Sequence, residues 1–267
     1  MKANATTGLA TKNAVGGVLG WSAFSFLLLS LLVPWYVVTW TTTTTDNFVN
    51  HRDDCKEVAM FFWSTILCQP SPNNKEGSYC PRREESPCFQ LAISNFWTYH
   101  SSNDEPFPLF EQLTPIFATS LFLMLFVTMA ALLVALLFTV RCCCMNKRAT
   151  PLTLNLGTFV FAAVGFIILS MTIIYFAAAM PNAFRKGLVE DDLYYGEGSH
   201  GEGPWSSFIG KGVTVGPDSS VKSSWSAAGW WLALLAWPFY LSALVTLGSL
   251  MHHTHEAEGY AVLHPKV

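Results

Sequence analysis

Charged residues are scarce in this sequence. Only 12% of its 267 residues are Asp, Glu, Lys or Arg, against about 25% in an ordinary soluble domain. Four stretches carry none of them, and each exceeds the roughly 20 residues that a helix needs to cross a bilayer. These stretches are 13–45, 112–140, 149–184 and 223–255. The composition therefore excludes a soluble domain and predicts an integral membrane protein whose first partner is the lipid bilayer.

The uncharged stretches predict helices, because they show no alternation of polar and apolar residues and backbone groups in lipid must be satisfied internally. The predicted spans are Gly16 to Val38, Ile116 to Val140, Leu154 to Met180 and Gly229 to Met251. The remaining segments are the tails 1–15 and 252–267, the outer loops 39–115 and 181–228, and the short turn 141–153. The expected fold class is an all-α transmembrane four-helix bundle with a small disulfide-stapled extracellular β-sheet.

No Asp, Glu, Lys, Arg or His falls within the four predicted spans. Proton relays, voltage sensors and most ion pathways need ionisable groups at membrane depth, so the sequence argues against a pump or an ion-coupled transporter. It also lacks the G-x-S-x-G, P-loop and HExxH motifs. We therefore expect no enzymatic activity, no cofactor and no bound metal.

Basic residues close to the predicted spans indicate the orientation of the chain, because such residues stay on the cytoplasmic side. The N-terminal tail and the short turn carry Lys2, Lys12, Arg141, Lys147 and Arg148 and no acid. Both termini are therefore predicted to be cytoplasmic, at the plasma membrane, with both larger loops outside. Residues 41–113 hold five basic and ten acidic residues, and 181–226 hold four and six. Loops with this net acidity argue against nucleic acid as a partner.

The seven cysteines fall into two groups. Cys55, Cys68, Cys80 and Cys88 lie in the first outer loop, where an oxidising compartment and an even number predict two disulfides in one of three pairings. Cys142, Cys143 and Cys144 lie where the second span meets the basic turn, a common place for S-palmitoylation. The alternative for this second group is three reduced thiols at a helix end.

The first outer loop has the composition of a small sheet. The first span is expected to continue as a strand, because the β-branched run VVTWTTTTT occupies 37–45. Two further runs rich in aromatic and β-branched residues, 58–67 and 89–99, predict more strands, and an irregular disulfide-tied loop is the alternative. In the second outer loop, 196–204 (GEGSHGEGP) is expected to be mobile or to face a partner, and 213–215 could add a short edge strand.

Two short patterns point to packing and sorting. Gly16 and Gly20 form a GxxxG pair, and such small residues let helix backbones approach closely in membranes. Packing within the bundle is expected, with self-association as the alternative. Near the end of the chain, Tyr260 and Leu263 fit the Y-x-x-Φ pattern of a sorting motif.

The arrangement resembles the claudin/PMP22 superfamily of four-span proteins, in which a tryptophan and cysteine signature lies on a small extracellular sheet. The corresponding residues here are Trp40, Trp63, Cys68 and Cys80. The motif departs from that family because Phe61 and Phe62 precede Trp63 in place of Gly-Leu. A distant branch, such as amastin-like or Sur7-like surface proteins, fits equally.

The resemblance and the missing catalytic groups lead to one functional hypothesis. We expect a non-enzymatic tetraspan that organises membrane, or mediates lateral or adhesive contacts, through its first outer loop. Its partner would be another copy of itself or another integral membrane protein. The alternative is a pore-forming or accessory subunit of a channel or larger membrane complex, in which Asp53, Asp54 and Glu57 line a pathway.

Overall fold

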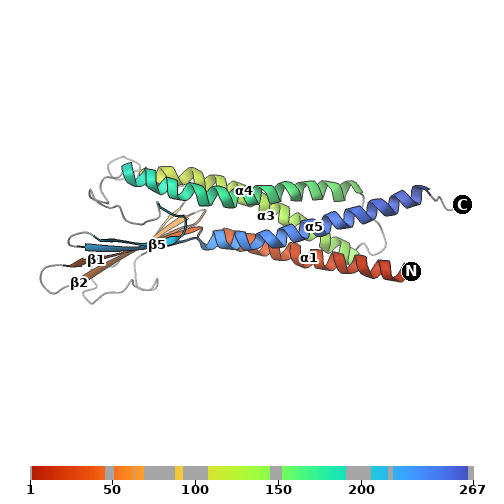
Figure 1. The fold of residues 1–267 in the computed structure, drawn as a ribbon, viewed down its shortest axis with the longest axis horizontal. Helices are drawn as coiled ribbons and strands as arrows, with labels where there is room; N and C mark the ends of the chain where they lie inside the picture. Colours follow the sequence, from red (N-terminus) through yellow and green to blue (C-terminus); the bar gives the residue numbers. More distant parts are fainter. Residues whose placement is uncertain are drawn as a thin grey trace. The chain divides into compact units, whose positions relative to one another are not determined.

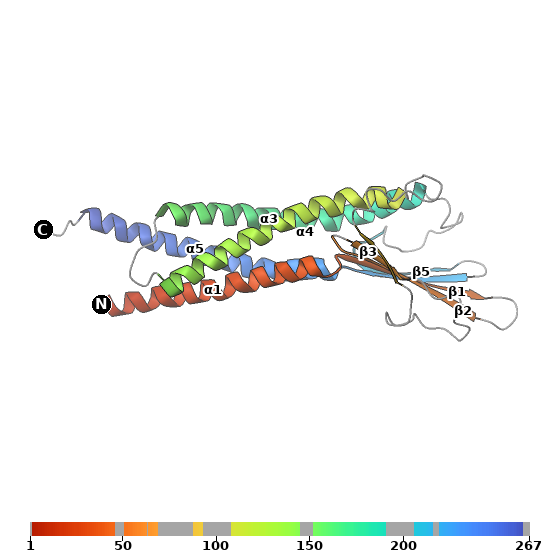
Figure 2. The same ribbon diagram turned by 180° about the vertical axis from the view of Figure 1, so that it is seen from behind.

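In the residues that it describes, a computed structural model of the protein has four long helices and six strands. Figures 1 and 2 show these elements as a ribbon. The structure describes residues 2–45, 51–62, 64–68, 88–92, 108–144, 152–190, 206–215 and 219–263. The helices are α1 (Lys2–Leu32), α3 (Pro108–Cys144), α4 (Leu152–Glu190) and α5 (Ala228–Leu263). Each contains a segment long and apolar enough to cross a membrane: Thr11–Leu32, Gln112–Cys143, Leu156–Lys186 and Ala228–His252. The prediction of four membrane-spanning helices is confirmed to this extent.

The helix ends differ from the predicted span ends. The first span was expected to reach Val38, but α1 ends at Leu32 and a strand begins at Tyr36. Pro34 explains the early end, because proline has no N–H to donate and disfavours a helical conformation in the residue before it. At the other ends the helices extend beyond the predicted spans, and Tyr260 and Leu263 of the predicted tail lie in α5.

Both outer loops contribute to a single antiparallel sheet, with strand order β4-β3-β2-β1-β6-β5. The first loop supplies β1 (Tyr36–Thr45), β2 (His51–Met60), β3 (Ser64–Cys68) and β4 (Cys88–Ala92). The predicted strand at 58–67 is in fact divided between β2 and β3. The second loop supplies β5 (Gly210–Val215) and β6 (Ser219–Ser226), so it forms two strands where one short edge strand was expected. Residues 196–204 lie outside the described part of the chain.

The chain divides into two compact units, and each is described by itself. We call Met1–Leu29, Phe122–Ile173 and Leu232–Val267 the bundle unit, and Ser30–Leu121 with Ile174–Trp231 the sheet unit. The bundle unit contains parts of all four helices. The sheet unit contains the six strands and the adjoining ends of the same helices.

Small residues bring helices of the bundle unit close together. A Cβ atom added to Gly16 would overlap the buried ring of Phe138, and one added to Gly20 would lie 3.1 Å from the Cα atom of Ala135. The GxxxG face of α1 therefore packs on α3 within the same chain, as expected for a packing motif in lipid.

Hydrogen bonds between helices also support the bundle unit. The Trp237 indole donates to the Ser170 hydroxyl at 2.9 Å, and the Tyr240 hydroxyl donates to the Ala162 carbonyl at 3.2 Å. Both bonds join α5 to α4. Such bonds contribute about 0.6 kcal/mol each in membranes, so they orient the helices while close packing supplies most of the stability.

The predicted disulfide staple of the sheet is not shown. The structure describes cysteine side chains only for Cys142 and Cys143, and both are free thiols. The backbones of Cys55, Cys68 and Cys88 are described, whereas Cys80 lies outside the described residues. Two disulfides in the first loop therefore stay a prediction.

Candidate functional site

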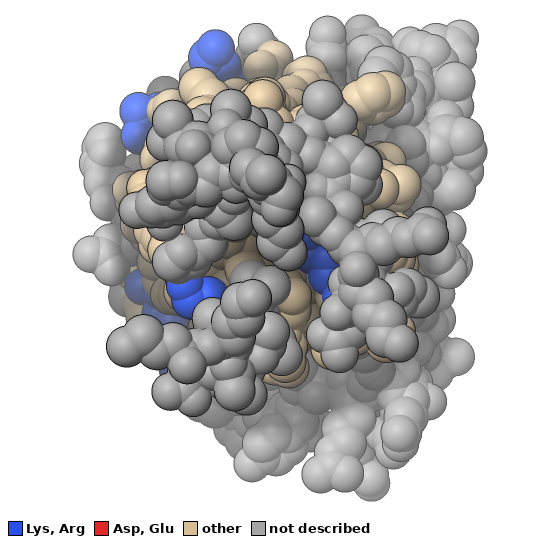
Figure 3. Space-filling model, turned by 90° about the vertical axis from the view of Figure 1, so that its right-hand side faces the viewer, with Lys and Arg blue, Asp and Glu red and all other residues tan. Residues whose placement is uncertain are grey.

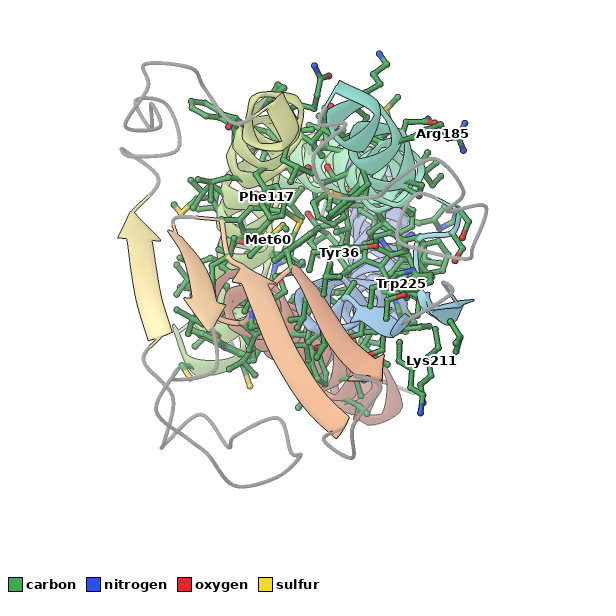
Figure 4. The ribbon with its side chains drawn as sticks, turned by 90° about the vertical axis from the view of Figure 1, so that its left-hand side faces the viewer. Tyr36, Met60, Phe117, Arg185, Lys211 and Trp225 are labelled. Atoms are coloured by element: carbon green, nitrogen blue, oxygen red, sulfur yellow. The ribbon has the colours of Figure 1, made fainter. Side chains whose placement is uncertain are left out.

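The sheet unit has a core of aromatic side chains between the strands and the helix ends (Figure 4). We call this core the aromatic base and define it by six residues: Trp35, Tyr36, Phe62, Phe117, Phe176 and Phe208. Neighbouring rings have centroids 4.4 to 6.2 Å apart, mostly in tilted or edge-to-face arrangements. Such geometries add about 0.5–1.5 kcal/mol per pair beyond the burial of apolar area. The aromatic base therefore fixes the sheet to the helix ends.

Trp35 is the centre of the aromatic base and is fully buried. Its indole N–H donates to the Ser30 carbonyl at 2.7 Å, and its backbone N–H donates to the Met60 carbonyl at 2.8 Å. These bonds satisfy polar groups at the point where α1 ends and β1 has not yet begun. The Gly229 N–H donates to the Pro34 carbonyl at 3.0 Å, which attaches the start of α5 to the same junction.

Tyr36 connects the aromatic base to the second outer loop. Its buried hydroxyl donates to the Phe208 carbonyl at 3.0 Å, and burial raises the pKa of the phenol above its usual value. The raised pKa means that the folded protein holds this proton more tightly than the unfolded chain. Stability from this group is therefore complete below about pH 10 and declines as the pH rises further.

We expect Tyr36→Phe to lower the free energy of unfolding by about 0.5–1.5 kcal/mol, because the Phe208 carbonyl loses its donor. Thermal unfolding in detergent between pH 7 and 11 measures the effect. The variant should also lose less stability than the wild type above pH 10. An identical alkaline decline in both proteins would contradict the assignment of this proton to Tyr36.

The strands β1, β6 and β5 have one buried face and one accessible face. On the buried face, Val38 is opposite Trp225, and the Trp225 indole donates to the Ser207 carbonyl at 2.9 Å. On the other face, Lys211, Val213 and Lys222 are exposed. This alternation follows the two-residue period of a strand. Lys211 points away from the aromatic base in Figure 4.

In the described part of the chain the accessible face ends at β5, which pairs with β6 and is the last strand in the order. Val213 is 56% exposed on this strand, and Ile209 just before it is 36% exposed. Lys211 lies between them. An edge strand with apolar side chains can pair with another chain, and a lysine on such an edge limits unspecific pairing. This edge and its accessible face form the candidate contact surface.

The sequence predicted a short edge strand at 213–215, which lies within β5, but it did not predict β6. A signal for β6 was nevertheless present. In this strand Ser223 and Trp225, which are buried, alternate with Lys222, Ser224 and Ser226, which are more accessible. That run is short and rich in serine, so strand propensity alone gives it little weight.

The structure describes only part of the tryptophan and cysteine signature that was predicted from the resemblance. Trp40 lies in β1, where its backbone is opposite Lys56 of β2 and Ser223 of β6. Trp63 and Cys80 lie outside the described residues. The acids Asp53, Asp54 and Glu57 all lie in β2, next to β1. Among the described residues, no group of three or more His, Cys, Asp or Glu side chains could hold a metal ion.

The sheet register distinguishes between the possible disulfide pairings. Cys68 of β3 is directly opposite Cys88 of β4, and it is opposite Glu57 of β2 on its other side. Cys55 is two residues from Glu57, so it is only a diagonal neighbour of Cys68. Directly opposite residues have Cβ atoms about 4.5–5.5 Å apart and diagonal ones are roughly 7–8 Å apart. A disulfide needs about 3.5–4.5 Å, which favours the directly opposite pair.

We therefore predict a disulfide between Cys68 and Cys88, formed when a disulfide oxidoreductase takes two electrons from the pair and each thiol loses its proton. Digestion with trypsin separates all four cysteines, since Lys56, Lys75 and Arg82 lie between them. Mass spectrometry of the non-reduced digest should find the peptide of Cys68 joined to that of Cys88. A peptide joining Cys68 to Cys55 or Cys80 would contradict the prediction.

No protein-family model matches the chain, and no curated protein matches it.

Proposed function

We propose that this protein is a non-enzymatic tetraspan of the plasma membrane, with cytoplasmic termini, whose outer sheet makes lateral contacts with a second copy of the chain. The observation that carries the proposal is the exposed β5 edge on a sheet held by the buried aromatic base. The resemblance to the claudin/PMP22 superfamily supports the same class of function. The contact surface would include the second loop as well as the first.

A contact surface of this kind works only if its shape is fixed before binding, because ordering a loop at the moment of contact costs affinity. Trp35 and Tyr36 meet that requirement, since both are buried and both donate hydrogen bonds across the sheet unit. An extended segment of a neighbour could then add to β5 by main-chain hydrogen bonds, with Val213 and Ile209 giving apolar contacts.

The test is energy transfer between two fluorescently tagged populations of the full chain in one membrane. We expect Val213→Asp to reduce transfer strongly, because it places a desolvated charge against the neighbouring strand. Val213→Thr is the matched control, since it keeps a β-branched side chain of similar size and strand propensity. It should retain transfer at equal expression.

Surface expression and thermal stability should be the same for both variants, because Val213 is exposed and outside the aromatic base. If Val213→Asp associates as well as the wild type, the β5 edge is not the contact surface. If the wild type shows no more transfer than an unrelated tetraspan at equal density, the proposal of self-association fails.

A pore-forming or accessory channel role is the second candidate. One observation favours it: Asp53, Asp54 and Glu57 lie together in β2, and Asp53 and Glu57 share one face of the sheet by strand alternation. Cation conductance of the reconstituted protein that falls on replacing Asp53 and Glu57 with Asn and Gln would support this role. Bilayers that stay silent at high protein density would exclude it.

A further inference from the structure

An open groove runs along the surface of the bundle unit between α1 and α3. Its volume is about 740 Å³, and its lining is mostly apolar, within the roughly 300–1,000 Å³ of typical small-molecule sites. On α1 the lining extends from Asn13 to Leu29. That is 17 residues, which span about 24 Å of helix. On α3 the lining lies within 138–143. The groove is therefore longer than the hydrocarbon of one leaflet, which is about 15 Å thick.

The groove exists because small side chains lie on α1 where larger ones would fill it. Gly17, Ser22 and Ser25 line it, together with the larger rings of Trp21 and Phe26. The Trp21 indole donates to the Thr139 hydroxyl of α3 at 3.0 Å, which holds that ring in place. The result is a fixed depression between two packed helices.

Two free thiols lie at one end of this groove. Cys142 and Cys143 are in the last turn of α3, both are exposed, and both belong to the groove lining. Arg141 precedes them. Figure 3 views the chain from the side on which this end lies, and Lys and Arg side chains are visible there among the described residues. Free thiols beside basic residues at the end of a span are the usual substrate for S-acylation.

We propose that Cys142 or Cys143 carries a long-chain fatty acyl group as a thioester, and that its hydrocarbon chain lies in the groove between α1 and α3. The thiol sulfur attacks the carbonyl carbon of a fatty acyl-coenzyme A. The sulfur loses its proton, a new carbon–sulfur bond forms, and coenzyme A leaves as its thiol. The exchange of one thioester for another needs no oxidant or reductant.

The occupant follows from the thiols in the lining. A tethered chain has a high effective concentration at a site that its attachment point borders, so it competes well with free lipid. The groove starts at the membrane boundary and follows α1 into the span, which is the direction that an attached acyl chain must take. It would fill a depression that otherwise leaves Gly17 and Trp21 in contact with bulk lipid.

The first experiment locates the attachment. The full chain is expressed in cells, thioesters are cleaved with hydroxylamine, and each freed thiol receives a polyethylene-glycol maleimide. We expect a mass shift in the wild type and in Cys144→Ser, and loss of the shift when Cys142 and Cys143 are both replaced with Ser. No shift in the wild type, or a shift that needs only Cys144, would overturn the proposal.

The second experiment locates the acyl chain. Cells incorporate a palmitate analogue with a diazirine in its chain, and cross-linked peptides are identified after irradiation. Cross-links should concentrate on the α1 segment 17–29 and disappear in the variant with both serines. Cross-links spread over all four helices would overturn the proposal. Equal labelling of α1 in the variant would also overturn it, because the groove would then hold free lipid.

Gly17→Leu tests whether the acyl chain lies in the groove, separately from whether it is attached. A Cβ added to Gly17 would lie 3.7 Å from the Phe138 Cβ, an ordinary contact, so the leucine fills the groove without forcing the helices apart. We expect unchanged acylation, an unchanged thermal midpoint and loss of the cross-links to α1. Gly157→Leu is the matched control, since a Cβ there meets nothing within 4 Å. Undiminished cross-links to α1 in Gly17→Leu would overturn the proposal that the acyl chain lies in the groove.

Discussion

Replacing Trp35 with alanine is expected to lower the free energy of unfolding by about 3–5 kcal/mol, the range for a fully buried tryptophan or phenylalanine. The ring is completely buried, and its centroid lies 4.4 Å from that of Phe62 and 4.9 Å from that of Phe176. The substitution leaves a cavity where α1 passes into β1 and removes the donor to the Ser30 carbonyl. Near-UV circular dichroism during thermal unfolding in detergent measures the loss.

The matched control for Trp35→Ala is Trp231→Ala in the same unit. Trp231 is 49% exposed, so its removal should cost much less. Trp35→Phe should give an intermediate loss, because it keeps most of the ring but leaves the Ser30 carbonyl without its indole donor. Equal losses from Trp35→Ala and Trp231→Ala would contradict the central position given to Trp35.

Gly165→Leu is expected to be strongly damaging to the bundle unit, with a loss of about 1–3 kcal/mol from overpacking. A Cβ at this position on α4 would lie 2.7 Å from the Tyr240 hydroxyl oxygen and 2.9 Å from the Ala130 Cβ. Both neighbours are buried, one on α5 and one on α3, so three helices would have to separate. Retention of the folded monomer during heating, followed by size-exclusion chromatography, measures this loss.

Gly157→Leu makes the same substitution on the same helix in open space. It should be neutral or slightly stabilising, because leucine is a better helix former than glycine by roughly 0.8 kcal/mol. If both variants lose stability equally, the cause is the added apolar bulk and not the helix junction at Gly165. The contrast between them therefore isolates packing from composition.

The existence of the four spans followed from the sequence, but their ends did not. The absence of charge from 13–45 identifies a segment that can lie in the bilayer. The end of a helix, in contrast, depends on local backbone geometry. Pro34 ends α1 at Leu32, inside the uncharged stretch. At Cys144 and Leu263 the opposite holds, since α3 and α5 continue past the apolar segments. Composition predicts a membrane segment and does not predict a helix cap.

The sheet shows a different limit. Five consecutive threonines after Trp40 predicted β1 directly, because β-branched side chains favour strands. Nothing in that run indicates that its neighbour on one side is β6, about 180 residues later in the chain. The pairing of Thr41 with Lys222 depends on where α1 and α5 place their ends, and strand propensity carries no information on this.

The sequence alone determined the class of this protein: four apolar helices, an outer loop with strands, and cysteines gathered in two places. Those properties depend on composition and on the two-residue period of strands, which are local. The tertiary structure decided which surfaces result. It brought β5 and β6 into one sheet with β1, placed Cys68 opposite Cys88, and opened a groove beside Cys142 and Cys143. Each depends on close approach between segments distant in the chain, which packing sets.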